Sequence, residues 1–369
     1  MSEKWEMKTL GSLCDFVRGP FGGSLLKSCF QTSGYAVYEQ QHAIYDQFED
    51  IRYFIDESKY LEMKRFELCS GDLIMSCSGT MGKVAIVPDG IAQGIINQAL
   101  LKLSPRKGII VEFLKHWMSS PNFQDELSKL SQGVAIKNVA SVKVLKEIQI
   151  FLPSPHEQKR IVSIVDEAFE AIDIAIDNTK QNLTNARELF DSYLNAIFTQ
   201  KGEGWVNKRL GDISEVQSGG TPLRSKNEVD LTFILHAINS VKPELLNLRR
   251  GVRQKNLSLQ KIKDIVLAVP ELREQQLVVR QLACMSKETQ SLEAIYRQKL
   301  TALNELKQSI LHKAFTGELT ADTADLKTNI KPEAIAVWVL IWLDRSFWWI
   351  DCLRSAETIE RFCIQSVQN

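Results

Sequence analysis

Two long segments of the chain place apolar residues at helical spacing. In the first, Ile161, Val165 and Ile172 belong to a stripe whose members recur every three or four residues. Such a stripe stays on one face of an α-helix, so the pattern predicts one long helix over residues 153–200. Ser154 is the expected N-cap, because its hydroxyl can accept a hydrogen bond from a free N–H group of the first turn.

A second long helix is predicted over residues 271–319, where Leu282, Leu292 and Leu303 repeat this rhythm. Each stripe is narrow and extends over roughly 65 Å at the usual rise per residue, which is typical of a coiled-coil seam. The stripes need partners, and a globular segment between them allows the chain to turn back. We therefore expect an antiparallel pair; the alternative is that each helix only stiffens a globular core.

The segment before the first helix has a different texture, with short apolar runs bounded by turn residues. This pattern is typical of strands and predicts them at residues 35–40, 72–79, 83–90, 98–103 and 147–153. Helical spacing is found only at residues 111–120 and 122–130. Residues 1–152 are therefore predicted to form a globular module of the α+β class.

The second half of the chain repeats the first. At an offset of 117 residues, Glu157 and Gln158 fall on Glu274 and Gln275, and "ELFDSYLNAIFT" falls on "ELKQSILHKAFT". At the amino end, "WEMKTLGSL" answers "WVNKRLGDI" at an offset of 200, so about 82 residues are missing from the second copy. The missing part is the counterpart of roughly residues 27–108.

The repeat divides the chain into five predicted parts. They are a first globular module at residues 1–152, a helix at 153–200, a truncated second module at 201–270, a helix at 271–319 and a tail at 320–369. The predicted fold is α+β, with long antiparallel coiled-coil helices in a duplicated, pseudo-twofold arrangement.

Composition adds limited information. The chain is 44% hydrophobic and 24% charged, as in ordinary globular proteins, and its net charge of zero does not by itself indicate a nucleic-acid binder. The amino terminus has no basic and apolar leader, and the longest apolar run, "AIAVWVLIWL", is about half of a bilayer span, so we expect a cytoplasmic protein. The seven cysteines include no C-x-x-C pair, which predicts buried free thiols.

Three loops contain candidate binding chemistry. In "RGPFGGSLL" the glycines could bring backbone amides close to a phosphate, although a plain turn explains them equally well. "YEQQHAIY" gathers the amide and imidazole groups that read base edges. "SCSGTMGKVAIV" resembles a phosphate loop but lacks the required first glycine and the final hydroxyl, so it is predicted to be a turn between two strands.

Catalytic motifs are missing from the sequence. It contains no H-E-x-x-H, no G-x-S-x-G and no nuclease-like P-D-x(n)-E-x-K pattern. The methyltransferase signatures N-P-P-[YF], D-P-P-Y and F-x-G-x-G are also missing. We therefore expect a protein that is not itself an enzyme and that holds no cofactor and no metal.

In its repeated order of a globular module followed by a long helix, the chain resembles the DNA-specificity subunit of type I restriction-modification enzymes. The resemblance covers about residues 3–319 and is carried by "LGSLCDFVRG", "LGDISEVQSGGTP", "GDLIMSCSGTMGKVAIV", "GVAIKNV", the two helix starts containing "EQ", and "KAFTGEL". It implies two target-recognition domains that each read half of a bipartite DNA site, with the two helices fixing the spacing. It also implies that modification subunits bring S-adenosylmethionine and methylate adenine, and that restriction subunits bring ATP and Mg-dependent translocation and cleavage.

Within this resemblance, the three loops and the "GVAIKN" segment supply the residues expected to face DNA, with basic side chains on phosphates and amides on base edges. These candidates are Arg18, Ser24, Lys27, Gln40, Gln41, Ser78, Thr80, Lys83, Lys137 and Asn138. Partner subunits are expected at the helix junctions, around Glu157, Gln158, Glu274 and Gln275.

The chain departs from the family pattern in its second module, where "SGGTPLRSKNEVDLTFILHAI" passes from the opening loop directly to the late helix. The leading hypothesis is therefore a specificity subunit that reads only one half-site. The alternative is a degenerate scaffold, or recombination cassette, that docks methylase subunits without productive DNA recognition. Self-association is a further expectation left open, and an enzyme in its own right is disfavoured by the missing motifs.

Overall fold

The computed structural model describes residues 5–320 apart from 22, 131–138, 140, 216–223, 226–228 and 248–258. The predicted contacts Lys137 and Asn138 and the tail therefore lie outside the described residues. The described chain divides into two compact units. The first contains residues 5–173 and 304–320, and the second contains residues 174–303.

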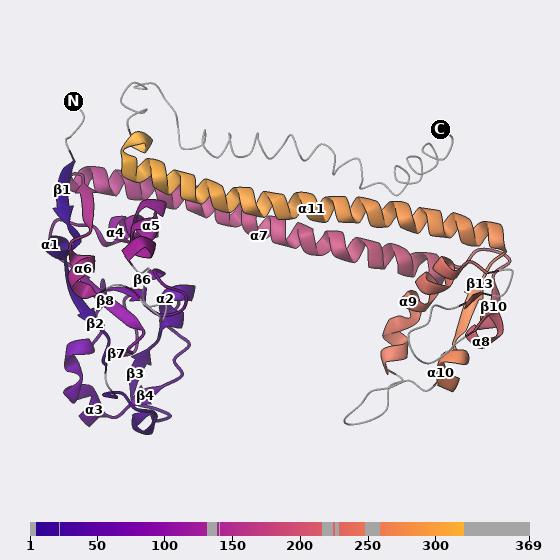
Figure 1. Cartoon of the computed structure of the whole chain (residues 1–369), viewed down its shortest axis with the longest axis horizontal. Helices are drawn as coiled ribbons and strands as arrows, with labels where there is room; N and C mark the ends of the chain where they lie inside the picture. The colour runs from indigo at the N-terminus through magenta and orange to yellow at the C-terminus, as the bar shows by residue number, and fades with distance from the viewer. Residues whose placement is uncertain are drawn as a thin grey trace. The chain divides into compact units, whose positions relative to one another are not determined.

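The two long helices are α7 (Pro155–Gln200) and α11 (Leu272–Thr316). The predicted N-cap is confirmed, since Ser154 Oγ accepts a hydrogen bond from the backbone N–H of Glu157 at 3.4 Å. In the first unit the beginning of α7 packs against the end of α11, whereas in the second unit the end of α7 packs against the beginning of α11 (Figure 1). Antiparallel packing is thereby confirmed, and each helix also contributes to a globular core.

Exposed ion pairs accompany this helix packing. In the first unit Lys307 on α11 contacts Asp173 on α7 at 2.5 Å, and in the second unit Arg187 contacts Glu293 at 3.3 Å. Pairs of this kind contribute little to stability because water screens them. Most of the interhelical stabilisation therefore comes from the apolar stripe.

The first module has an outer part next to the helices. Strand β1 (Glu6–Thr9) pairs antiparallel with β9 (Gln149–Leu152), and the short helices α1 (Leu10–Leu13) and α6 (Val142–Lys146) contact each other beside this pair. Helices α4 (Val111–Ser119) and α5 (Pro121–Leu130) complete it. Gly11 in α1 is a close-contact position, because a Cβ there would lie 2.8 Å from Lys146 Cβ.

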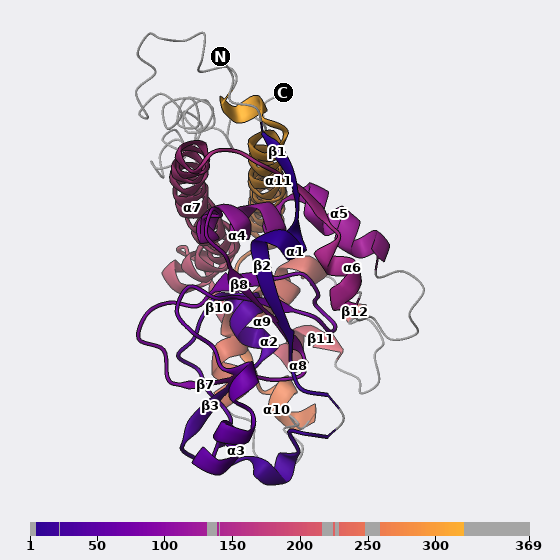
Figure 2. The same cartoon turned by 90° about the vertical axis from the view of Figure 1, so that its left-hand side faces the viewer.

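The inner part of the first module consists of two small sheets. One has the order β2-β8-β5-β6 and is antiparallel throughout, with β2 (Cys14–Arg18), β8 (Leu100–Pro105), β5 (Leu73–Ser76) and β6 (Val84–Ile86). The other has the order β4-β3-β7, with β4 (Phe54–Ile55), β3 (Tyr35–Tyr38) and β7 (Gly94–Ile96), where β3 and β7 run parallel. Figure 1 shows β3, β4 and the helix α3 (Glu57–Glu62) on the side of this module away from α7, and Figure 2 shows the same for β3 and α3.

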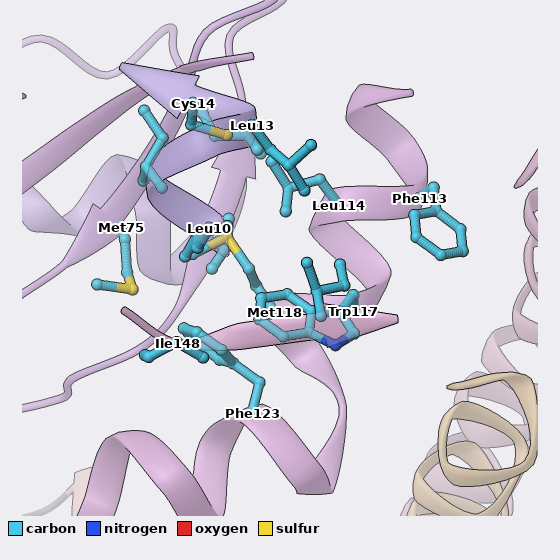
Figure 3. Close-up of a cluster of buried hydrophobic side chains, with 14 of the residues drawn as sticks. Leu10, Leu13, Cys14, Met75, Phe113, Leu114, Trp117, Met118, Phe123 and Ile148 are labelled. Atoms are coloured by element: carbon cyan, nitrogen blue, oxygen red, sulfur yellow. The ribbon is translucent and has the colours of Figure 1, made fainter. Parts of the chain in front are cut away.

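The main core of the first module joins the four-stranded sheet to the helices. Figure 3 shows Leu10, Met75 and Ile148 in one buried cluster with Trp117 of α4 and Phe123 of α5. Ile161 and Val165 of α7, together with Leu311, Ala314 and Phe315 of α11, belong to the same buried cluster. Each large apolar side chain buried in this way stabilises the fold by about 1.5–3 kcal/mol, so the module and the adjacent helix ends form one packing unit.

All five predicted strand regions contain a strand, and both predicted helices at residues 111–120 and 122–130 are present as α4 and α5. The prediction of helix only at these two places is wrong, because α1, α2 (Gln40–Tyr45), α3 and α6 also form. Their short length hides helical periodicity, but α3 and α6 have side-chain N-caps. Asp56 accepts a hydrogen bond from Lys59 N at 2.7 Å, and Ser141 accepts one from Val144 N at 3.4 Å.

The described part of the second module repeats the outer part of the first. Strand β10 (Val206–Arg209) pairs with β13 (Val266–Val269), and helices α8 (Leu210–Ile213), α9 (Leu231–Asn247) and α10 (Leu259–Lys263) follow the order of α1, α4 and α6. Gly211 lies against Lys263 as Gly11 lies against Lys146. The remaining strands, β11 (Ser214–Glu215) and β12 (Arg224–Ser225), form a short pair.

This second module has a smaller core of its own. Phe233, Ile234 and Ala237 of α9 are buried against Leu267 of β13 and Leu282 of α11. Within the described residues, it has no counterpart of the sheet order β2-β8-β5-β6. The module thus keeps its attachment to the helices without the inner sheets that the first module has.

The cysteines of the described chain differ in their burial. The prediction of buried thiols is confirmed for Cys14 and Cys77 and wrong for Cys69, which is exposed, whereas Cys29 and Cys284 are half-buried. Burial raises the pKa of the Cys14 thiol to about 12. Among the described helices, none has both the length and the apolarity needed to cross a bilayer.

Candidate nucleic-acid interface

A short turn between β7 and β8 brings several loops of the first module together. In this central turn (Asn97–Ala99), Asn97 N donates to the carbonyl oxygen of Tyr38, which ends β3, at 2.9 Å. Ala99 O accepts a hydrogen bond from the backbone N–H of Cys77, which directly follows β5, also at 2.9 Å. The next residue, Leu100, accepts a hydrogen bond from Gly19 N just beyond β2, also at 2.9 Å. The ends of β2, β3 and β5 therefore meet at one edge of the module, although they are far apart in sequence.

The loop after β2 is fixed at its base by close backbone packing. A Cβ at Gly19 would lie 1.8 Å from Asn97 O, so only glycine fits there. Beyond it, Ser24 Oγ donates a hydrogen bond to Phe21 O at 2.8 Å. Lys27 opens a short 3₁₀ helix (Lys27–Cys29) and is exposed. The predicted contacts Ser24 and Lys27 are thus on the surface of this edge.

Arg18 links two of the loops. Its guanidinium lies 5.7 Å from the ring centroid of Phe21, which is a cation–π distance. It also forms a side-chain hydrogen bond with the thiol of Cys77, and burial raises the pKa of that thiol to about 12. The thiol therefore stays neutral, and the positive charge of Arg18 is not cancelled by it.

The loop between β5 and β6 is the predicted turn. Ser76 Oγ accepts a hydrogen bond from Lys83 N at 3.0 Å, and Gln124 of α5 donates to Gly82 O at 2.9 Å. Thr80 and Lys83 are exposed, as predicted, whereas Ser78 is half-buried. Among the described residues, Lys27 and Lys83 form no ion pair, which leaves both charges available to an anion.

The two predicted glutamines have different surroundings. Gln40 begins α2 next to the end of β3, and its Oε1 is buried without a hydrogen-bond partner. An unpaired buried acceptor is costly, which makes this side chain a candidate for a partner outside the chain. Gln41 instead donates from Nε2 to Asp50 O at 3.0 Å, so its amide already stabilises the loop after α2.

His42, from the same motif, is structural. It is fully buried, its Nδ1 accepts a hydrogen bond from Glu39 N at 2.9 Å, and its Nε2 lies 3.1 Å from Asp50 O. This geometry fits the neutral ring with its proton on Nε2. Lys137 and Asn138 come just before Val139, whose N–H donates to Cys77 O at 3.1 Å.

The structure adds surface residues that the sequence did not indicate. Gln98 is exposed in the central turn itself, and Phe21 is 63% exposed in the loop after β2. Arg52 is also exposed and pairs with Glu39, the N-cap of α2, at 2.9 Å. Tyr53 lies beside it, because its carbonyl accepts a hydrogen bond from Val37 N at 2.9 Å. The pairing of β3 with β4 brings Arg52 and Tyr53 to this edge, and no local motif contains that information.

The predicted partner contacts require a correction. Gln158 is fully buried; its Oε1 accepts from Ile110 N at 2.8 Å, and its Nε2 donates to Gly108 O and Pro153 O at 3.0 Å each. Gln275 repeats this in the second module, accepting from Asp230 N and donating to Pro270 O at 2.8 Å each. Both amides therefore hold a module onto its helix, and the interpretation as partner contacts is wrong for these two side chains.

The neighbouring glutamates are also engaged within the chain. Glu274 accepts a hydrogen bond from Trp205 Nε1 at 2.7 Å, and Glu157 lies 3.5 Å from the guanidinium of Arg160. The described residues contain no group of three or more His, Cys, Asp or Glu side chains placed to hold a metal ion.

Comparisons with known proteins identify similar sequences. Residues 2–185 match the family model described as "Type I restriction modification DNA specificity domain". The chain is 26% identical over 167 residues to the type I restriction enzyme MjaIX specificity subunit of Methanocaldococcus jannaschii, a match that covers 40% of this chain and 37% of that protein. It is 32% identical over 139 residues to the EcoBI specificity subunit of Escherichia coli, covering 37% of this chain and 29% of that protein.

Solved structures share the fold. The HsdS subunit from Thermoanaerobacter tengcongensis matches with a TM-score of 0.53 at 17% identity, over 86% of this chain and 98% of that chain. A chain from a study of complex assembly and conformational transition of the type I R-M system matches with a TM-score of 0.69 at 16% identity, over the same shares.

The fold and the matched domain together define the class: the chain belongs to the family of type I restriction-modification DNA-specificity proteins. Its sequence matches span only about a third of the length of the curated relatives.

Proposed function

We propose that the chain is a non-catalytic DNA-specificity subunit whose first module reads one half of a bipartite duplex site. The DNA would lie across the edge formed by the loop after β2, the central turn, the β5–β6 loop and the start of α2. The observation that carries the proposal is the meeting of these loops, which places Arg18, Lys83 and Gln40 at one edge. Cations suit phosphates and carboxamides suit base edges, so this edge has both kinds of group that a duplex requires.

Partner subunits complete the proposed activity. Modification subunits would bring S-adenosylmethionine and methylate adenine, and restriction subunits would bring ATP and Mg for translocation and cleavage. The two long helices would set the spacing between the recognised half-sites and provide docking surface for these partners. The exposed apolar side chains Ile174, Leu189 and Ile295, all of the second unit, support a docking role for the helices.

The second module supports a competing proposal. Its described part keeps the outer strands and helices and lacks inner sheets, which favours a scaffold that docks methylase subunits without productive recognition. The two proposals differ in one measurable property. A reader discriminates between duplex sequences, whereas a scaffold binds duplexes only through charge, without sequence preference.

Selection from a random-sequence duplex pool, with and without the modification subunit, tests the proposal. We expect an enriched sequence in one half-site, and affinity for the selected duplex that falls as salt rises. Lys83→Ala should lower the slope of log affinity against log salt by about 1, because one phosphate contact is lost. Lys107→Ala is the matched control, since this exposed lysine follows β8 at the other end of the same sheet. Enrichment of no sequence, or equal slopes for both variants, would overturn the proposal.

A further inference from the structure

An exposed aromatic ring stands out at the proposed DNA-facing edge. Phe21 is 63% exposed, although a phenylalanine gains free energy when it is buried. A surface that binds a polyanion by charge alone has no use for such a ring. Its presence among cations and amides therefore needs its own explanation.

The backbone that precedes the Phe21 ring is tightly packed. Gly19 and Pro20 before it are buried, and Gly19 packs directly on the backbone of the central turn. After it, the hydroxyl of Ser24 donates a hydrogen bond to Phe21 O at 2.8 Å. The buried Gly19 and Pro20 therefore anchor the backbone that leads into Phe21, and the side chain of Phe21 itself is exposed.

Arg18 adds a second constraint. Its guanidinium lies 5.7 Å from the centroid of the Phe21 ring, and it also forms a hydrogen bond with the thiol of Cys77 in the neighbouring loop. The cation supports one side of the ring and provides a positive charge beside it. Apolar side chains such as phenylalanine are inserted between base steps by proteins that kink DNA, and a cation beside the ring can contact an adjacent phosphate.

We infer that Phe21 is a wedge that inserts into the base stack of the recognised half-site and stacks on a partly unstacked base, with Arg18 as its positioning residue. This inference rests on the proposed function, since it assumes that the edge contacts duplex DNA. It adds a contact that depends on how easily a base step opens, so that flexible pyrimidine–purine steps are preferred at this position.

Permanganate oxidation of unstacked thymines in the duplex selected with the wild-type chain tests the inference. Wild-type protein should make a thymine of the half-site reactive, and Phe21→Ala should abolish this reactivity. Loss of one base–aromatic stack predicts an affinity lower by roughly 5- to 100-fold. The slope of affinity against salt should not change, because the substitution removes no charge. Phe21→Trp should restore the reactivity, which a merely structural role would not predict.

Phe151→Ala is the matched control, because this phenylalanine of β9 is 53% exposed and lies in the outer strand pair. It should leave both reactivity and affinity unchanged. If the wild-type chain selects no sequence, the proposed function fails. If it selects one and Lys83→Ala lowers the salt slope, but Phe21→Ala behaves like Phe151→Ala, the wedge alone is refuted. Circular dichroism of each variant verifies that the fold is retained.

Discussion

The two buried glutamines at the helix starts offer a direct test of how the modules are attached. Gln158, at the start of α7 in the first unit, forms hydrogen bonds with the loop before α4 and with Pro153 after β9. Gln275, at the start of α11 in the second unit, forms the equivalent hydrogen bonds with the loop before α9 and with Pro270 after β13. Substitution by leucine keeps approximate volume but removes the amide. We expect Gln158→Leu to loosen the start of α4, and Gln275→Leu to loosen the start of α9.

The magnitude follows from the groups left behind. In Gln158→Leu the N–H of Ile110 and the buried carbonyl of Pro153 lose their partners, whereas Gly108 is exposed and its carbonyl can turn to water. An unsatisfied buried donor or acceptor costs about 1–3 kcal/mol, so two of them lower the local unfolding free energy by roughly 2–6 kcal/mol. Gln158→Glu should have a similar effect, because a carboxylate has the same shape but no N–H to donate.

Amide hydrogen exchange measured peptide by peptide is the appropriate assay. Gln158→Leu should accelerate exchange in the first turns of α4 and leave α9 unchanged, and Gln275→Leu should do the reverse. Lys159→Leu, at the exposed neighbouring position, is the control and should change neither region. If Gln158→Leu protected α4 as well as the wild type does, the two glutamines would not be the attachment that their hydrogen bonds indicate.

The remaining predictions concern single contacts. Gly19→Ala should destabilise the first unit by about 1–3 kcal/mol or more and weaken DNA binding, as measured by denaturant titration and fluorescence anisotropy, because its Cβ would lie 1.8 Å from a backbone oxygen of the central turn. Burial lowers the pKa of His116 despite the raising effect of Asp166. The folded state then binds fewer protons than the unfolded state, so stability should fall as the pH drops below about 6.5, and His116→Gln should flatten this dependence in pH-dependent unfolding. Arg187→Ala should cost under about 1 kcal/mol in thermal unfolding, since its ion pair with Glu293 is exposed.

Local pattern was sufficient for the long elements. The stripe containing Ile161 and Val165 predicted α7, and the hydroxyl of Ser154 with the following proline predicted its start, because a helix of this length repeats its signal many times. Short apolar runs likewise predicted β3, β5 and β8. The short helix α2 was missed, since six residues hold less than two turns of periodicity.

The candidate site could be predicted only in part. The loops after β2 and β5 were identified by their glycines and hydroxyls, but their meeting depends on the antiparallel pairing of both strands with β8, which no local pattern encodes. Gln158 was expected to contact a partner subunit at the helix junction, but it is buried within the chain. Only the loop from another part of the chain, ending at Ile110, explains why it is buried.

The nested construction of the first module has an evolutionary consequence. Its inner sheets are formed entirely by the segment from β2 to the start of α4, while the outer strand pair and helices of both modules have matching strand registers and matching glycine contacts. A foreign inner segment could therefore be grafted between these two points without altering the attachment to the helices. Target preference would then change by exchange of one contiguous gene segment, with the assembly machinery left intact.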